Sequence, residues 1–118
     1  IEGDKAALRD GSVFEYCKLN DMVIQAWSVL QFGYFKGNFV GKEQFHDLNE
    51  VLNRLALKYG VSPSAIAIAW VLRYPAKMQA VVGTTNTKHL LEASQASNVN
   101  LTRKEWYEIY LAAGNDLP

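Results

Sequence analysis

Cysteine and an excess of either charge are what this sequence most clearly lacks. Cys17 is the only cysteine in 118 residues, which excludes an intrachain disulfide framework and a cysteine-cluster metal site. A single thiol fits a reducing compartment, so we expect a cytoplasmic protein. Because no basic cluster adjoins Cys17, we expect a buried and inert thiol. The twelve basic residues balance the twelve acidic ones, which argues against nucleic acid or an anionic membrane as a partner.

Long apolar runs and a recognisable leader are also missing. No apolar run approaches the ~18 residues of a membrane span, and residues 1–5 do not resemble a signal peptide. His46 and His89 are the only histidines. Neither has a set of carboxylates or thiols nearby at ligand spacing, so we expect no metal site. Since the first residue is Ile1 rather than Met, we expect the chain to begin inside a longer one.

Hydrophobic residues make up 49% of the chain, enough for the core of one domain, and their spacing predicts helices. Asp47 and Glu50 have capping-box spacing, and the helix that they begin has one apolar face and a stop at Gly60. Ser62-Pro63 then places an N-cap before a proline. This pair predicts a second helix over 64–73, which is apolar nearly all round and must be buried on several sides.

Two further helices are predicted from the capping-box pattern. Ser12 and Glu15 have this spacing near the start of the chain. Thr102 and Glu105 have it near the end, and Gly114 supplies the stop for that last helix. Both segments are amphipathic, so each needs an apolar surface to pack against.

Two nearly continuous apolar runs, over 22–30 and 78–82, are typical of strands that are covered on both faces. Helices separate them, which predicts a parallel pair joined by a right-handed crossover. A parallel sheet of two strands is not a stable domain, because such strands need neighbours and covered faces. The chain is therefore predicted to be a piece of a larger α/β protein.

Residues 31–45 form a long segment that is rich in glycine and aromatic residues. Structured loops of this length commonly line binding sites. The alternative is that the aromatic side chains only pin the loop to the body of the protein, and the sequence does not decide between the two. The residues concerned are Phe32, Gly33, Tyr34, Phe35, Gly37, Phe39 and Gly41.

A short strand, a tight turn and a hydroxyl-rich helix start follow one another over 81–93. The unpaired N–H groups and partial positive charge of a helix N-terminus suit an anion, of which phosphate is the usual one. The alternative is a plain strand-to-helix connection that is capped by Thr85 or Thr87.

Three segments, taken in order, resemble the aldo-keto reductases. They are QAWSVL at 25–30, VSPSAIAIAWVLR at 61–73 and VVGTTNTKHLLEA at 81–93. Their spacing is similar to that of the C-terminal third of this family, and the final helix resembles a bacterial branch of it. Because the family folds as a (β/α)8 barrel, the resemblance implies a C-terminal fragment of a TIM barrel, with the last two strands, flanking helices and a closing C-terminal helix.

The divisions that this resemblance implies cover the whole chain as one partial barrel. They are a loop and helix over 1–21, a strand over 22–30, a cofactor-side loop over 31–46, two helices over 47–73, a strand over 78–82, and a phosphate turn with two helices over 83–118.

The resemblance also implies an NAD(P)H-dependent oxidoreductase that reduces aldehydes or ketones by hydride transfer, with NADPH the usual cofactor and NADH possible. Trp27 stands where the family places an aromatic ring that stacks on the nicotinamide. His89 stands where the family usually has Arg, which puts the preference for NADPH in question. The implied cofactor-binding residues are Trp27, Ser28, Val29, Leu30, Gln31, Gly33, Gly83, Thr84, Thr85, Asn86, His89 and Glu92.

The family's catalytic Asp, Tyr, Lys and His lie on earlier strands, upstream of this chain, so no catalytic residue is carried over. Without the tyrosine, carbonyl reduction lacks its general acid, and the chain alone is predicted to be inactive. A small carbonyl compound would be the substrate of the full-length parent. The tyrosines that match no catalytic position are Tyr16, Tyr34, Tyr59, Tyr74, Tyr107 and Tyr110.

Three interpretations stay open at this point. The first is a fragment of a carbonyl reductase, and the second is a stand-alone truncated module that binds a nucleotide or another protein. The third is a small helical domain in which the apolar runs over 22–30 and 78–82 are not strands. If they are strands, their unpaired edges predict self-association or pairing with the missing half of the barrel.

Overall fold

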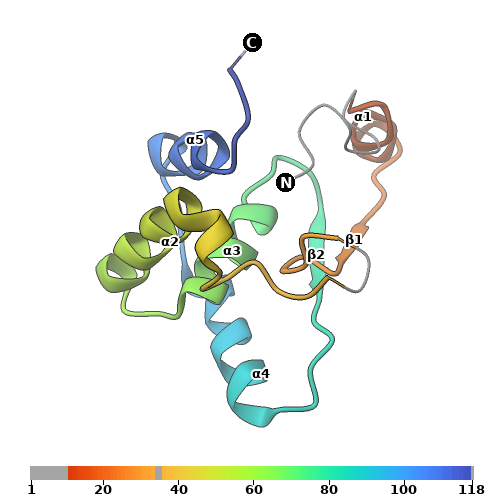
Figure 1. Ribbon diagram of the computed structural model, residues 1–118. Helices are drawn as coiled ribbons and strands as arrows, with labels where there is room; N and C mark the ends of the chain where they lie inside the picture. Colours follow the sequence, from red (N-terminus) through yellow and green to blue (C-terminus); the bar gives the residue numbers. More distant parts are fainter. Residues whose placement is uncertain (1–10, 34–35, 118) are drawn as a thin grey trace.

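The protein combines a small parallel sheet, a group of helices beside it and a peripheral N-terminal helix (Figure 1). This computed structural model describes residues 11–33 and 36–117. Most of the loop predicted ahead of the first helix lies outside the described residues, as do Tyr34 and Phe35. The elements in chain order are α1 (Ser12–Leu19), β1 (Ile24–Trp27), the 3-10 turn η2 (Glu43–Phe45), α2 (His46–Tyr59), α3 (Pro63–Leu72), β2 (Met78–Val81), α4 (Thr87–Ser94), the 3-10 turn η3 (Gln95–Asn98) and α5 (Arg103–Ala112).

The two strands pair in parallel, as the sequence predicts. The register places Ile24 opposite Met78 and Trp27 opposite Val81. A hydrogen bond of 3.1 Å between the side-chain amides of Gln25 and Gln79 crosses the pair on its exposed face. The helices α2 and α3 form the connection between the strands, as in a βαβ unit.

Both strands are shorter than the predicted ranges 22–30 and 78–82. β1 ends at Trp27 because the next residue, Ser28, has a φ of 55° and turns the chain out of the sheet. Along each strand half-buried residues alternate with exposed ones. The expectation that both faces are covered is therefore wrong for the described residues, since one face of the sheet is open.

The core is centred on the helices. The largest fully buried side chains are Leu52 and Leu55 of α2 and Ile66 and Ile68 of α3. α3 packs against α2, α4, η3 and β2, which explains why it is apolar on nearly every side. The sheet contributes only partly buried residues, such as Ala80, to the rim of this core.

Three helix ends follow the rules that the sequence analysis used. The Ser62 hydroxyl accepts the N–H of Ala65 at 3.2 Å, with proline at the first helical position. Thr102 and Glu105 form the complete capping box, since each side chain accepts the backbone N–H of the other residue. α2 ends at Gly60, which has a φ of 66°. These predictions are confirmed.

The capping boxes predicted at Ser12 and Asp47 are wrong. Gly11, with a φ of 74°, is the N-cap of α1, so Ser12 already lies within the helix. The turn η2 continues directly into α2, whose N-cap is Phe45. Asp47 therefore lies in the first turn, where its carboxylate still interacts favourably with the helix dipole.

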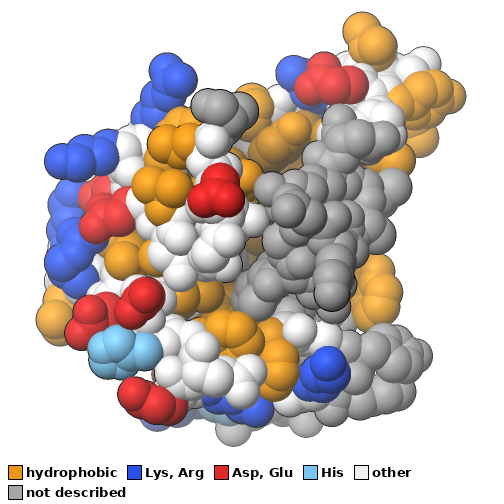
Figure 2. All heavy atoms as spheres, turned by 45° about the horizontal axis from the view of Figure 1, so that its top comes forward, with side chains coloured by type: hydrophobic (Ala, Val, Ile, Leu, Met, Phe, Trp, Pro, Cys, Tyr) orange, Lys and Arg blue, Asp and Glu red, His pale blue; other side chains and the backbone are white. Residues whose placement is uncertain are grey.

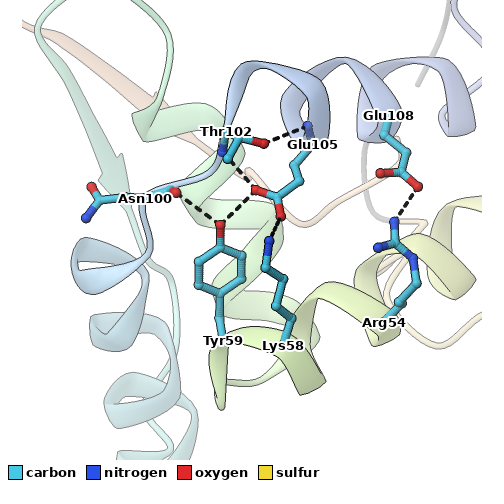
Figure 3. Close-up of polar contacts among 7 residues, drawn as sticks. All are labelled: Arg54, Lys58, Tyr59, Asn100, Thr102, Glu105 and Glu108. Atoms are coloured by element: carbon cyan, nitrogen blue, oxygen red, sulfur yellow. Dashed lines mark hydrogen bonds and ion pairs between the residues drawn. The ribbon is translucent and has the colours of Figure 1, made fainter.

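A buried carboxylate on α5 ties that helix to α2 (Figure 3). Glu105 accepts hydrogen bonds from the Lys58 ammonium at 2.5 Å, the Tyr59 hydroxyl at 2.7 Å and the Thr102 N–H at 2.8 Å. Burial alone would raise the pKa of the Glu105 carboxyl. The hydrogen bonds outweigh that effect and lower its pKa to about 2.

Charges of both signs intermingle on the surface over α2 and α5 (left in Figure 2). One such pair joins Arg54 of α2 to Glu108 of α5, beside the Glu105 cluster (Figure 3). Both side chains of this pair are more than one-third exposed, so it contributes little to stability. The mixture of signs matches the neutral balance of the sequence.

Within 11–33 and 36–117 no single helix is long and apolar enough to cross a membrane. Only Glu43–Tyr59 and Pro63–Leu72 taken together reach that length and composition, and the pair is bent by 93°. Most apolar side chains of the two helices belong to the core described above, whereas Leu57 of α2 is 86% exposed.

Candidate functional site

A cavity of about 530 Å³ opens at the C-terminal ends of the two strands. It lies between the sheet, the segment that follows β1, and helices α3 and α4. The volume falls in the ~300–1,000 Å³ range of small-molecule sites. In parallel α/β proteins this end of the sheet is where ligands bind.

Most of the residues predicted from the sequence to bind a cofactor surround this cavity. The predicted residues that line it are Trp27, Ser28, Val29, Leu30, Gln31, Gly83, Thr84, His89 and Glu92. Gly33, Thr85 and Asn86, all within the described residues, lie outside the lining. Two segments that are far apart in the sequence thus form one site, because parallel pairing brings the ends of β1 and β2 together.

Trp27 presents an open aromatic surface at the mouth of the cavity. It is the last residue of β1, its side chain is 68% exposed, and it pairs with Val81 across the sheet. Ser28 follows with its φ of 55°, a left-handed conformation that costs a non-glycine residue ~1–3 kcal/mol and is common at functional sites. The Ser28 carbonyl accepts the N–H of Gln31 at 2.9 Å, which closes the turn out of the sheet.

The turn after β2 is organised by Asn86. Its side-chain oxygen accepts the N–H groups of Lys88 at 2.9 Å and His89 at 3.4 Å, so Asn86 is the N-cap of α4. The caps predicted at Thr85 and Thr87 are therefore wrong. Two amides at the start of α4 are already occupied by Asn86, so the helix N-terminus by itself offers less to an anion than the sequence indicated.

Side chains with hydrogen-bonding and charged groups remain at this end of the cavity. Thr84 and Glu92 are half-buried, and His89 is exposed. The Lys88 ammonium lies 3.9 Å from the Glu92 carboxylate on the next turn of α4, with the lysine 80% exposed. Such an open pair is weak and free to rearrange around a ligand.

The sequence left open whether the aromatic residues of the segment after β1 line a binding site or pin the segment to the body of the protein. The rings of Phe32 and Phe39 both pack against Phe45, at centroid distances of 5.1 and 6.2 Å. These rings pin the segment to the helical core. The cavity instead receives the polar residues Gln31 and Asn38, which face each other in an antiparallel bridge. Within the described residues the segment therefore does both: Phe32 and Phe39 anchor it, and Gln31 and Asn38 line the site.

The cavity also contains residues that the sequence analysis missed. Ser64 and Ile68 line it from α3, and their spacing of four residues puts them on one helix face. Because α3 is apolar on nearly every side, its sequence does not reveal which face borders a site. Asn38 was missed because only the folded bridge to Gln31 brings it to the cavity.

Across the part of the chain that the structure describes, no group of three or more His, Cys, Asp and Glu residues could hold a metal ion. His46 lies near Glu43 and Glu50 on the outer surface, at 3.6 and 3.4 Å. His89 lies at the cavity instead. The two histidines therefore belong to different parts of the molecule.

Residues 7–112 match the sequence profile of the aldo/keto reductase family. The chain belongs to this family. The resemblance found in the sequence is thus confirmed. Family membership, together with the paired parallel strands, rules out the interpretation as a small helical domain.

Three curated relatives of this aldo/keto reductase chain are bacterial. A 6-dehydroglucose reductase of Agrobacterium fabrum is 38% identical over 94 residues, which is 78% of this chain. A 6-dehydroglucose reductase of Novosphingobium aromaticivorans is 28% identical over 94 residues, or 79% of the chain. The oxidoreductase YdhF of Escherichia coli is 30% identical over 95 residues, also 79% of the chain. The chain spans 30% of the length of each of these relatives.

A solved structure shares the fold. It is the thermostable aldo-keto reductase Tm1743 in complex with the inhibitor epalrestat, matched with a TM-score of 0.64 and 24% identity. The match covers 90% of this chain and 34% of that one. The two strands and their helices therefore have the fold of part of a TIM barrel.

Proposed function

We propose that this chain supplies the cofactor-binding side of an NAD(P)H-dependent oxidoreductase that reduces aldehydes or ketones by hydride transfer. In this proposal β1 and β2 are the last two strands of the (β/α)8 barrel, and α5 is its closing helix. The observation that carries the proposal is the cavity at the strand ends, with the exposed ring of Trp27 at its mouth. The activity is proposed for a protein of the length of the relatives, of which the chain spans 30%.

The residues present fit the nicotinamide half of such a cofactor. Trp27 offers a flat and exposed aromatic face where its strand ends, and aromatic rings stack well in an offset arrangement. Stacking on this face would hold the ring in one orientation, which is how a positioned group lowers the barrier of a transfer step. The bound cofactor supplies the hydride.

The other end of the cavity fits the phosphate and adenosine groups. Leu30 and Gln31 border it after the turn at Ser28 and would lie along the pyrophosphate. At the far end, the Thr84 hydroxyl and the His89 ring line the cavity, and in this proposal they would lie beside the 2′-phosphate. Neither carries a permanent positive charge, so charge-assisted bonds are lacking and NADH should compete well with NADPH.

In this proposal the proton donor comes from outside this chain. Among the described residues, no Tyr, Lys or Asp lines the cavity. The Tyr59 hydroxyl, for example, is bonded to Glu105 and to the Asn100 carbonyl. The tyrosine that serves the family as general acid has no counterpart in the lining, so the chain by itself is expected to bind nucleotide without turning over substrate.

A stand-alone nucleotide-binding module is the second candidate function. It is favoured by one observation, namely that nine of the twelve residues predicted to bind the cofactor line one cavity in this chain. Both candidates require nucleotide binding. They differ in whether added strands of the barrel would restore turnover of an aldehyde.

The test is titration of the purified chain with NADPH and with NADH, followed by the fluorescence of the nicotinamide itself. Saturable binding is expected, with Trp27→Ala abolishing it and Trp27→Phe retaining most of it, because phenylalanine keeps an aromatic face. Leu57→Ala is the matched control, since Leu57 is 86% exposed on α2 and does not line the cavity. Failure of the unsubstituted chain to bind either nucleotide at millimolar concentration would refute the proposal.

A further inference from the structure

Asn49 is a buried polar residue in the first turns of α2, and its side chain holds the segment that follows β1. It is 8% exposed. Its amide oxygen accepts the N–H of Gly41 at 2.8 Å. Its amide nitrogen donates to the carbonyls of Phe39 at 3.0 Å, Lys42 at 3.1 Å and Phe45 at 3.0 Å. One side chain thus binds three residues of the loop and the start of its own helix.

These contacts use both N–H donors of the carboxamide and one of the two lone pairs of its oxygen. The group has two N–H donors and one acceptor oxygen, so three carbonyls share two hydrogens. No apolar residue could make these hydrogen bonds, so losing the Asn49 side chain would weaken the attachment of the loop to α2. Asn49 therefore specifies the path of the loop, because a different path would separate the side chain from its partners.

The loop is connected in turn to the cavity through Phe39. The Phe39 carbonyl accepts from Asn49, and its N–H donates to the Leu30 carbonyl at 3.0 Å. The next residue back, Asn38, accepts the N–H of Val40 at 2.8 Å and lines the cavity, as does Leu30. The Phe39 ring is only 6% exposed, so this residue cannot shift without disturbing the core.

We propose that Asn49 is a positioning residue for nucleotide binding. By fixing residues 39–42 it holds Leu30 and Asn38 in place, so this side of the cavity is formed before a ligand arrives. The inference rests on the function proposed above. A preformed site binds more tightly because the loop has no ordering to undergo on binding, and a fractionally formed site binds more weakly in proportion to its occupancy.

The primary test compares Asn49→Ala with Asn53→Ala. Asn53 is the matched control, since it is the same residue type one turn further along α2 and is exposed. Asn49→Ala is expected to weaken NADPH binding roughly tenfold, mainly through faster dissociation. Asn53→Ala should leave both affinity and dissociation rate unchanged. Asn49→Ser, which keeps a small polar group, serves as the variant to measure if the alanine form does not fold.

A second readout reports on the loop without any ligand. Hydrogen exchange at the Gly41 amide should become much faster in Asn49→Ala than in the unsubstituted chain, because that N–H loses its acceptor. Ile109→Val is the control for a general loss of stability. It changes a core residue of α5 that is 5% exposed. It should lower the melting temperature without accelerating Gly41 exchange at low temperature and without changing NADPH affinity.

Each outcome decides the question. Faster Gly41 exchange together with weaker NADPH binding supports the positioning role. Faster exchange with unchanged affinity overturns it and leaves Asn49 as a structural residue only, and unchanged exchange overturns it as well. If the unsubstituted chain binds neither NADPH nor NADH, the proposed function fails and this inference fails with it. That result is distinguishable because it appears before any substitution is made.

Discussion

Trp70 and Trp106 form two reciprocal hydrogen bonds with each other. The indole N–H of each donates to the backbone carbonyl of the other at 3.0 Å, and the two rings stack at 4.6 Å with their planes 10° apart. Trp70 lies on α3 and Trp106 on α5. The pair therefore joins the last helix to the central one by a reciprocal contact that neither residue could make alone.

Replacing either tryptophan should show this reciprocity. Trp106→Phe keeps an aromatic ring but removes one N–H donor and reduces the stacking area, and we expect a loss of about 1–2 kcal/mol in the free energy of unfolding. Trp70→Phe should cost a similar amount. The double variant should cost less than the sum, because the residues are in direct contact. Urea unfolding followed by circular dichroism measures all three, with Tyr107→Phe on α5 as a neutral control; additive losses would contradict the coupling.

The Glu105 cluster predicts a specific dependence of stability on pH. The folded-state pKa of Glu105 is about 2, below the ordinary value of 4.5. The carboxylate therefore contributes stability that is fully present above pH ~4.5 and is lost as the pH falls towards 2. Glu105→Gln should reduce the free energy of unfolding by ~1–3 kcal/mol at pH 7, and the difference from the unsubstituted chain should shrink steadily below pH ~4.5.

Glu108→Gln provides the control for that measurement. Glu108 lies on the same helix and is also paired, with Arg54, but its side chain is 38% exposed. Its substitution should change stability by no more than a few tenths of a kcal/mol. Equal effects of the two substitutions across the pH range would show that the buried network has no special role.

Cofactor preference is predicted to depend on position 89. His89→Arg adds a permanent charge at the cavity, and it should tighten NADPH binding roughly tenfold with little effect on NADH, which has no 2′-phosphate. The gain should fall as ionic strength rises. Leu90→Arg adds the same charge at the neighbouring position, which does not line the cavity. If both substitutions tightened the binding of both nucleotides equally, a general electrostatic attraction rather than a contact with the 2′-phosphate would be responsible.

Self-association is predicted from the open sheet. Each strand of the pair has one unpaired edge in the described residues, and Val23 next to β1 is 51% exposed. Light scattering coupled to gel filtration should detect dimers or larger species whose fraction rises with concentration. Val23→Lys should shift the distribution towards monomer, because a charge beside a strand edge opposes strand addition. A monodisperse monomer at all concentrations would be inconsistent with this prediction.

Local rules predicted the helices well and several of their ends poorly. Ser62 and Thr102 cap as expected because the residues around them also fit their roles, with Pro63 at the first helical position and Glu105 at the third. The spacing at Asp47 is equally good, yet a 3-10 turn extends the helix backwards past it. That extension is accompanied by contacts from outside the helix, since the Phe45 ring packs against Phe32 and Phe39.

Part of the candidate site could be predicted from the sequence because the pairing of the two strands could be predicted. The residues after β1 and β2 are adjacent in space because the strands are parallel, and the apolar runs and family resemblance predict that pairing. The contributions of Ser64 and Asn38 depend on how α3 is rotated and how the loop folds back. Asn49 contacts residues four to ten positions away, and Glu105 contacts Lys58 at a separation of 47. Helix periodicity and capping patterns do not report such contacts.

The position of the core among the helices has a consequence for the order in which the chain opens. Leu52, Leu55 and Ile66 are sealed between α2 and α3, whereas β1 and β2 rest on that core by one face only. The strands can therefore separate in a local fluctuation that leaves the helices folded. Amide hydrogens of the sheet should exchange with solvent through this local opening, which has a low free energy. Amide hydrogens of α2 and α3 should exchange only through complete unfolding. The helical part, with the loop that Asn49 attaches to it, is thus a cooperative unit, and the two strands form a more adjustable layer on it.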